Sequence, residues 1–290
     1  MKIKLRGKGM AAMLALTIPL VASSAESREQ AAARLNAEGV GLMQKNDSAG
    51  AIERFRASID ADVTHMAAYH NLGKLLIIAK EYAAAEQLLQ NGLSVCPSDA
   101  GCLVQLVQVT ALSGNSELCR QTLKNEGLTK DPALLPSLSL LLMAQKSYRE
   151  AEFAADLAVG KFPENDECWY DKGLIHERQG QWENAERAYA HAIALKPGNV
   201  NAWVNRGNMQ DKLGLTDAAI ASYEKAYAAS SDSPLALYNL GRLLVLKGRN
   251  PVRGLSLLQQ ATKYGSSRGA VEARELLAYL VTQTKKGGVK

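Results

Sequence analysis

The sequence lacks the short motifs that commonly mark an enzyme active site. It contains no G-x4-G-K-[ST] phosphate loop, no G-x-G-x-x-G, no G-x-S-x-G, no H-E-x-x-H and no C-x-x-C. Its four histidines, at positions 65, 70, 176 and 191, are scattered along the chain. These absences predict a protein that is not an enzyme, with no cofactor and no metal.

A hydrophobic run long enough to span a membrane is also missing from the N-terminus. The basic segment MKIKLRGK precedes an apolar stretch of about 13 residues that Thr17 and Pro19 interrupt, whereas a span needs about 20. Small residues follow, up to Ala25. This order is typical of a secretory signal peptide, so residues 1–25 are expected to be cleaved, the alternative being an uncleaved anchor. No Cys stands at the cleavage point, which argues against a lipoprotein.

An excess of positive charge disappears once that segment is removed. The formal charge of the whole chain is +5, the four basic residues Lys2, Lys4, Arg6 and Lys8 supply four of it, and residues 1–25 hold no acid, which leaves +1. No run of Lys and Arg interleaved with aromatic residues remains, so nucleic acid is a poor partner. We expect a periplasmic protein without stable membrane insertion after cleavage. Secretion, or anchoring in the inner membrane, is the alternative.

The main positive feature is a 34-residue pattern that occurs twice in succession between Cys168 and Ser233. The copies read CWYDKGLIHERQGQWENAERAYAHAIALKP and AWVNRGNMQDKLGLTDAAIASYEKAYAASS. Apolar residues recur with a helical period on both sides of the second glycine in each copy. The pattern therefore predicts two antiparallel helices joined at Gly180 or Gly214.

A second glycine lies inside the first helix of each copy, at Gly173 and Gly207. Glycine costs about 1 kcal/mol relative to alanine in a helix interior, so a compensating contact is expected. We interpret this glycine and the alanine twelve residues later as the place where the two helices approach closely. Aromatic residues are expected to fill the space around that crossing: Trp169, Tyr189, Trp203 and Tyr223.

The two copies resemble the tetratricopeptide repeat, whose W-x2-L-G-x2-Y, A-x3-F and P pattern they match closely. The resemblance implies an all-α fold, a right-handed superhelical solenoid of helix pairs. It also implies that the first helices line a concave face, on which such arrays bind protein or peptide partners.

Weaker copies extend the pattern over most of the chain. We call the position of the first glycine the key position; it is occupied by Gly39, Gly73, Val107, Ser139, Gly173, Gly207 and Gly241, at spacings of 34 residues except for one of 32. Seven units are therefore expected within residues 26–268, at 32–65, 66–99, 100–131, 132–165, 166–199, 200–233 and 234–268. A capping helix at 269–284 and a disordered tail at 285–290 should follow. The third and fourth copies depart most, which predicts a wider helix crossing or a bend there.

The family resemblance further implies which residues face the concave groove, because family ligands lie mainly three before and one, four or five after the key position. Together with residues two before it, the expected partner-binding residues are His70, Asn71, Lys74, Gln108, Leu140, Met143, Tyr170, Asp171, Glu177, Arg178, Asn205, Asn208, Asp211, Tyr238, Asn239 and Arg242. The groove should be apolar near its centre, around Leu140 and Met143. The alternative is that these two side chains only pack on neighbouring helices.

The four cysteines raise the question of a disulfide, since an exported chain meets an oxidising compartment. Cys96 ends one predicted helix and Cys102 begins the next, so a bridge between them is one expectation and two free thiols the other. Cys119 and Cys168 are expected to be buried and inert.

These observations favour a non-catalytic scaffold or adaptor in the bacterial envelope that binds a protein or peptide partner on its concave face. Secretion, pilus, polysaccharide-export or cytochrome-assembly machinery are the contexts considered. The alternative is a non-catalytic tethering subunit of an envelope enzyme complex. An unrecognised enzyme is the third hypothesis, which an activity screen would test.

Overall fold

The computed structural model describes residues 26–287, so the expected signal peptide and the last three residues lie outside the described part. Within that part the chain forms sixteen helices and no strand, which confirms the all-α prediction. The helices are α1 (Arg28–Gln44), α2 (Ser48–Ala61), α3 (Met66–Ile78), α4 (Tyr82–Val95), α5 (Ala100–Ser113), α6 (Ser116–Leu123), α7 (Glu126–Thr129), α8 (Leu134–Ala144), α9 (Tyr148–Lys161), α10 (Asp166–Arg178), α11 (Trp182–Leu195), α12 (Val200–Lys212), α13 (Thr216–Ala229), α14 (Pro234–Leu246), α15 (Pro251–Ala261) and α16 (Arg268–Gly287).

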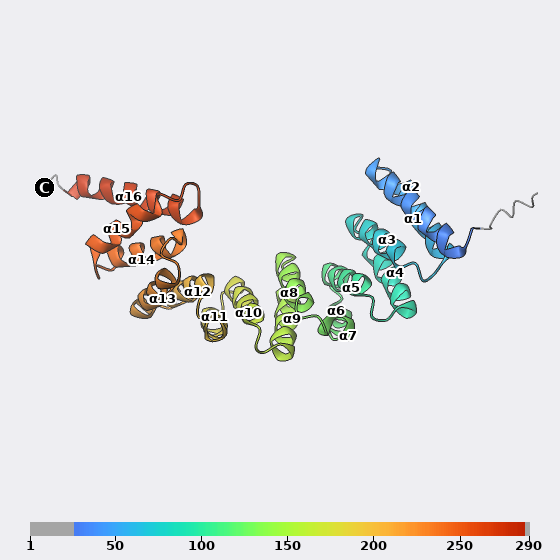
Figure 1. The fold of residues 1–290 in the computed structure, drawn as a ribbon, viewed down its shortest axis with the longest axis horizontal. Helices are drawn as coiled ribbons and strands as arrows, with labels where there is room; N and C mark the ends of the chain where they lie inside the picture. Colours follow the sequence, from blue (N-terminus) through green and yellow to red (C-terminus); the bar gives the residue numbers. More distant parts are fainter. Residues whose placement is uncertain (1–25, 288–290) are drawn as a thin grey trace, which may run out of the picture.

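Successive helices stack into an arc (Figure 1). The helix pairs are α1 with α2, α3 with α4, α5 with α6, α8 with α9, α10 with α11, α12 with α13, and α14 with α15. Along the middle of the arc the first helix of each pair lies on the inner side and the second on the outer side. The predicted solenoid of about seven helix pairs is therefore confirmed.

The turn that joins the two helices of each pair contains one residue with a positive φ angle. These residues are Asn46, Lys80, Gly114, Lys146, Gly180, Gly214 and Gly248. Each stands seven positions after a key position, so the turns share the spacing of the repeat. The left-handed region favours glycine. The turns at Gly180 and Gly214 could therefore be predicted from the sequence, whereas Asn46, Lys80 and Lys146 gave no such signal.

The two helices of a pair meet along a buried seam. The small residues twelve positions after the key position, such as Ala51, Ala185 and Ala219, are fully buried. The rings of Tyr189 and Tyr223, also fully buried, fill the space beside the key glycines. The close helix approach and the role expected for the two tyrosines are as the repeat pattern indicated.

The tryptophans lie at the edge of this packing. Trp169 and Trp203 are partly exposed, and each donates its indole Nε1–H to a proline carbonyl oxygen, at Pro163 and Pro197, over 2.8 Å. Both rings also pack against the buried core beside the second helices, as expected. Their hydrogen bonds in addition tie each unit to the loop that precedes it.

The third unit has a broken second helix. The eight-residue α6 is followed by the four-residue α7, whereas α11 in the fifth unit runs for 14 residues without interruption. Asn125 caps α7 by accepting from Gly127 N at 2.8 Å, and Leu128 of α7 is fully buried. The departure that the shortened spacing predicted thus takes the form of a split helix.

The core is divided into successive clusters. One is centred on α3, α4 and α5, a second on α8 and α9, and a third on α13, α14 and α15. Each is built from neighbouring units, as expected for a repeat array.

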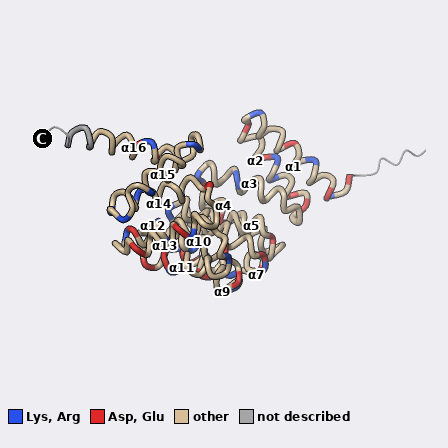
Figure 2. Tube along the Cα trace, turned by 60° about the vertical axis from the view of Figure 1, so that its left-hand side comes forward, with Lys and Arg blue, Asp and Glu red and all other residues tan. Residues whose placement is uncertain are grey.

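Helix α16 closes the array, with Ala270 and Ala273 fully buried. It runs to Gly287, and the expected disorder of residues 285–290 stays a prediction. None of the helices in residues 26–287 is both long and apolar enough to cross a membrane. Acidic and basic residues are interspersed along the described chain (Figure 2).

Candidate functional site

The inner side of the array is hollowed near its C-terminal end. This pocket, which we call the C-terminal groove, has a volume of ≈ 420 Å³ and is formed by α10, α12, α14 and α16. Seven of the sixteen residues expected to bind a partner line it: Glu177, Asn205, Asn208, Asp211, Tyr238, Asn239 and Arg242. Val204, Lys212, Leu235, Arg268 and Glu272 complete the lining.

Asparagine side chains in this groove keep part of their hydrogen-bonding capacity. Asn205 donates its Nδ2–H to the hydroxyl of Tyr170 over 3.1 Å, and Asn208 Oδ1 accepts from the buried Tyr223 hydroxyl at 2.7 Å. An amide group carries two N–H donors and a carbonyl acceptor. Among residues 26–287 no hydrogen bond is found to the Oδ1 of Asn205 or from the Nδ2 of Asn208, and both side chains are held in place by these tyrosines.

Charges in the groove are largely compensated within the chain. Arg242 Nη2 lies 2.6 Å from Asp211 Oδ2, and both side chains are mostly buried. Arg268 Nε lies 2.9 Å from Glu272 Oε1. Arg242, one of the expected partner-binding residues, thus already has a carboxylate partner within the chain.

Tyr238 presents a neutral hydroxyl to the groove. Burial, together with the Glu272 carboxylate, raises the pKa of Tyr238 above its ordinary value of about 10. The hydroxyl therefore keeps its proton near neutral pH and can donate a hydrogen bond.

The remaining expected residues lie outside this groove. Lys74 and Gln108 line a separate hollow of ≈ 220 Å³ in the N-terminal half. His70 binds Asp99, and Asn71 donates to Asn36 at 2.9 Å. The other four are Leu140, which is half-buried, Met143, which packs against the core, Tyr170, which binds Asn205, and the exposed Arg178. Met143 therefore packs on neighbouring helices, which is the alternative considered for it above.

Asp171 is the sixteenth expected residue, and its carboxyl is half-buried without a hydrogen-bond or ion-pair partner among residues 26–287. Burial, with a smaller effect from Glu167, raises its pKa to about 7. Asparagine occupies the equivalent position, two before the key position, in units that contain Asn205 and Asn239. The fifth unit therefore carries an acid where its neighbours carry a neutral amide.

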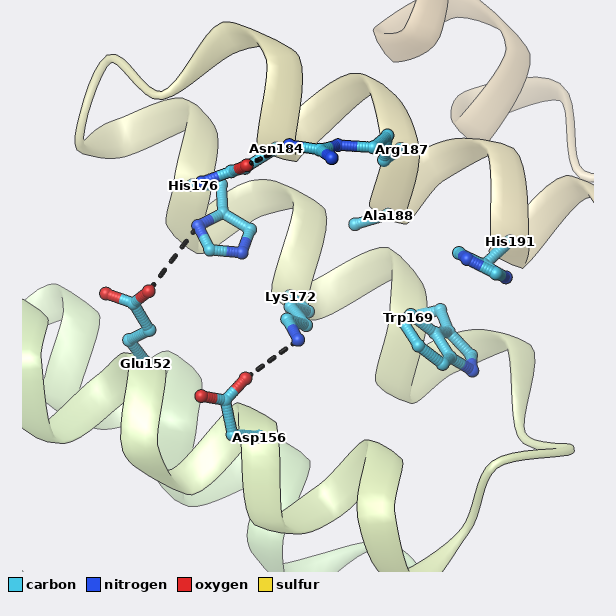
Figure 3. Close-up of a pocket in the computed structure, with 9 residues that line it drawn as sticks. All are labelled: Glu152, Asp156, Trp169, Lys172, His176, Asn184, Arg187, Ala188 and His191. Atoms are coloured by element: carbon cyan, nitrogen blue, oxygen red, sulfur yellow. Dashed lines mark hydrogen bonds and ion pairs between the residues drawn. The ribbon is translucent and has the colours of Figure 1, made fainter.

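A second hollow, of ≈ 370 Å³, lies between α9 and α11 and over α10 (Figure 3). Acidic side chains enter it from α9, Trp169, Lys172 and His176 from α10, and Arg187 and His191 from α11. Lys172 Nζ lies 2.8 Å from Asp156 Oδ1.

The two histidines of this hollow have defined partners. The buried His176 lies with Nδ1 2.7 Å from Gln181 Oε1 and 3.9 Å from Glu152 Oε1. The ring of His191 stacks on Trp169 with centroids 4.4 Å apart. Each of these two histidines therefore has a partner within the chain.

Only part of the polar lining of this hollow is repeated one unit further along the chain. At the equivalent place in the next unit, Glu186 accepts hydrogen bonds from Arg206 at 2.7 Å and from Gln210 at 2.9 Å. Alanine replaces Asp156, Asn184 and Arg187 there, at positions 190, 218 and 221. This hollow could not be predicted from the sequence because three helices contribute to it. The only signal available was the set of substitutions between this copy of the repeat and the one 34 residues later.

The four cysteines are free thiols in the structure. Burial raises the pKa of Cys102 to about 12 and the pKa of Cys119 and of Cys168 to about 11. Cys119 and Cys168 lie buried, as expected. A bridge between Cys96 and Cys102 stays a prediction, which peptide mapping without reductant would test.

Comparison with known proteins identifies the repeat. A family model described as Tetratricopeptide repeat matches residues 36–100, 137–200, 170–234 and 204–252, together more than half of the chain. No curated protein sequence matches this chain.

Several solved structures have a similar fold. The C-terminal part of a TPR repeat-containing protein from Cytophaga hutchinsonii is 12% identical with a TM-score of 0.52, over 82% of this chain and 98% of that one. Yeast Tom70 is 16% identical, with a TM-score of 0.49 over 89% of this chain, and this chain spans 55% of the Tom70 chain. Pseudomonas aeruginosa PilF is 16% identical, with a TM-score of 0.45 over 87% of this chain and 99% of that one. At these identities the likeness concerns the fold alone.

Proposed function

The chain belongs to the tetratricopeptide repeat family, and we propose that it is a non-catalytic scaffold that binds an extended segment of a partner protein in the C-terminal groove. The observation that carries this proposal is the convergence of seven expected binding residues on one pocket formed by four helices. Protein binding is the usual role of such arrays, and the groove is the part of this one best equipped for it.

The chemistry of the groove suits a peptide backbone. Each residue of an extended segment offers one N–H donor and one carbonyl acceptor. Asn205 Oδ1 and Asn208 Nδ2 offer one acceptor and one donor in return, and Tyr238 adds a hydroxyl. Tyr170 and Tyr223 set the positions of Asn205 and Asn208. Little side-chain freedom of these two residues is therefore lost when a partner binds, which lowers the free-energy cost of association.

The ion pairs within the groove affect which charge a partner segment can carry. Because Arg242 and Arg268 are already paired with acids, a strongly acidic segment gains little from them. We therefore propose a partner segment of mixed or neutral charge that is recognised chiefly through backbone and polar contacts.

Two isosteric substitutions test the groove with little disturbance to the fold. Asn208→Asp replaces the amide donor but keeps an oxygen to accept from Tyr223, and Tyr238→Phe removes only the hydroxyl. We expect the double variant to lose partners captured by crosslinking in intact cells and identified by mass spectrometry. Loss of one well-placed hydrogen bond weakens binding by about tenfold.

The matched control makes the same change on the same helix outside the groove. Asn201 is exposed on α12 and does not line the pocket, so Asn201→Asp should leave the captured partners unchanged. If the groove variant retains every partner, the C-terminal groove is not the binding site.

We further propose that the protein acts in the bacterial envelope after export. The basic, apolar and small-residue order of residues 1–25 supports this. N-terminal sequencing of protein released by periplasmic extraction should find Glu26 first; an intact Met1 in the membrane fraction would contradict export. Partners that form one enzyme complex would favour the alternative, a tethering subunit, over a scaffold for secretion, pilus, polysaccharide-export or cytochrome-assembly machinery.

A further inference from the structure

Three side chains with metal-binding chemistry meet where the second unit joins the third. His70 lies on α3, Asp99 is the N-cap of α5, and Cys102 lies in the first turn of α5. One ligand atom from each, namely His70 Nε2, an Asp99 carboxylate oxygen and Cys102 Sγ, lies within 4.8 Å of the other two. This junction is far from the C-terminal groove in the arc (Figure 1).

The glycine at position 101 leaves room for the His70 imidazole to approach Asp99. A Cβ built on Gly101 would lie 2.4 Å from His70 Nε2, so a side chain at this position would displace the imidazole. Glycine here therefore permits the histidine of one unit to reach the carboxylate that caps the first helix of the next.

The Asp99 carboxylate contacts both of the other side chains. His70 Nε2 lies 2.6 Å from Asp99 Oδ1, and the same oxygen accepts from Cys102 N at 2.7 Å. The Cys102 thiol also interacts with the Asp99 carboxylate through its side chain, so a cation bound to Oδ2 would lie beside the thiol and leave the Oδ1 helix cap in place. The imidazole is about one-third exposed, so a cation can reach it from solvent, and the Cys102 thiol lies buried behind it.

We infer that His70, Asp99 and Cys102 form a binding site for a divalent transition metal ion of the zinc class. A mixed nitrogen, oxygen and sulfur donor set suits Zn²⁺, whereas Mg²⁺ and Ca²⁺ require oxygen ligands. The Cys102 thiol releases its proton to solvent as the sulfur–metal bond forms, and no electron is transferred. Three protein ligands leave one tetrahedral position for water.

This site was not foreseen from the sequence, which predicted no metal. His70 stands 29 residues before Asp99, and no metal-ligand spacing links the two. Only the packing of α3 against the start of α5 brings them together. The site also differs in kind from the predicted Cys96–Cys102 bridge, because a disulfide would consume the thiol that the metal needs.

Cobalt provides the test, because a cysteine ligand gives Co²⁺ a thiolate-to-metal charge-transfer band in the near ultraviolet. The full chain, kept reduced by a phosphine rather than a thiol, is titrated with Co²⁺ and then with Zn²⁺. We expect a charge-transfer band that saturates at one equivalent of Co²⁺ and disappears as Zn²⁺ displaces it.

Variants locate the ligands. Cys102→Ser should abolish the band, whereas Cys119→Ser, which changes an equally buried cysteine elsewhere, should retain it. His70→Asn should weaken Co²⁺ binding by more than the roughly tenfold that loss of even an outer partner costs. Circular dichroism checks folding; if Cys102→Ser does not fold, the His70→Asn titration decides, since that side chain is partly exposed.

The outcomes against the site are equally specific. A wild-type chain without a charge-transfer band overturns the inference. So does a band that persists in Cys102→Ser, or a Co²⁺ affinity that His70→Asn leaves unchanged.

Discussion

The ring of Tyr189 occupies the space in which a side chain on Gly173 would begin. A Cβ built on Gly173 would lie 2.5 Å from Tyr189 Cε1. The tyrosine cannot move freely to relieve this contact, because it is fully buried and donates its hydroxyl to Glu177 Oε2 at 2.9 Å. The glycine in the middle of α10 thus sets the distance between the two helices of the fifth unit.

Gly173→Ala should therefore destabilise the protein despite the higher helix propensity of alanine. We expect a loss of about 1–3 kcal/mol in the free energy of unfolding, measured in urea, because a well-packed core resists an added methyl group. Gly160→Ala is the matched control: Gly160 is also helical, but its Cβ would have no neighbour within 4 Å. That variant should gain about 0.5–1 kcal/mol, and equal effects of the two would contradict the close packing.

The turn residues provide a second pair of variants. Gly214 has a φ of 76° and open space around it, so Gly214→Ala should cost about 1 kcal/mol through backbone strain alone. Lys80 has a φ of 62°, and Lys80→Gly should relieve the same strain and raise the melting temperature. A fall in melting temperature for Lys80→Gly would show that its side chain contributes more than the strain it imposes.

Asp171 should make stability depend on pH. Its folded pKa of about 7 lies above the ordinary value of 3.8, so the folded protein holds this proton more tightly than the unfolded chain. The stabilisation is present at low pH and is lost as pH rises through about 7.

Asp171→Asn removes this dependence and restores the amide found in neighbouring units. It should raise stability by roughly 1–3 kcal/mol near pH 8 and by much less near pH 4, as measured by thermal unfolding at both pH values. Asp60→Asn, at an exposed position, should change stability little at either pH. A gain for Asp171→Asn that is equal at both pH values would rule out the carboxyl as its source.

The ion pair between Arg242 and Asp211 should respond asymmetrically to mutation. Asp211→Asn leaves a mostly buried guanidinium without its carboxylate and should cost about 1–3 kcal/mol of unfolding free energy. The double variant Asp211→Asn and Arg242→Met should cost less than the sum of the single changes, because it leaves no buried charge unpaired. Additive costs in this cycle would mean that the two side chains are not coupled.

Regular features of the fold could be predicted from the sequence because they depend on residues close together in the chain. The Gly173, Ala185 and Tyr189 spacing places three side chains on one seam of a single helix pair. The turn at Gly214 could also be predicted locally, because a glycine in the sequence indicates a residue with left-handed backbone angles. Seven of the expected groove residues also proved to be neighbours, because the repeat fixes which side of each first helix faces inward.

Other features could not be predicted because their parts come from different units. Arg242 meets Asp211 across 31 residues, and His70 meets Asp99 across 29. Nothing local to either residue indicates its partner. The split of the third unit into α6 and α7 was indicated only as an irregularity, since a spacing two residues short does not say where the helix breaks.

The division of the core into successive clusters has a mechanical consequence. No single cluster spans the array, so a force pulling on α1 and α16 passes through the units in series. Small rotations between neighbouring pairs would add up along the arc, so we expect the ends of the molecule to move apart or together while each pair stays intact. Under greater tension we expect the units to unfold one after another rather than all at once.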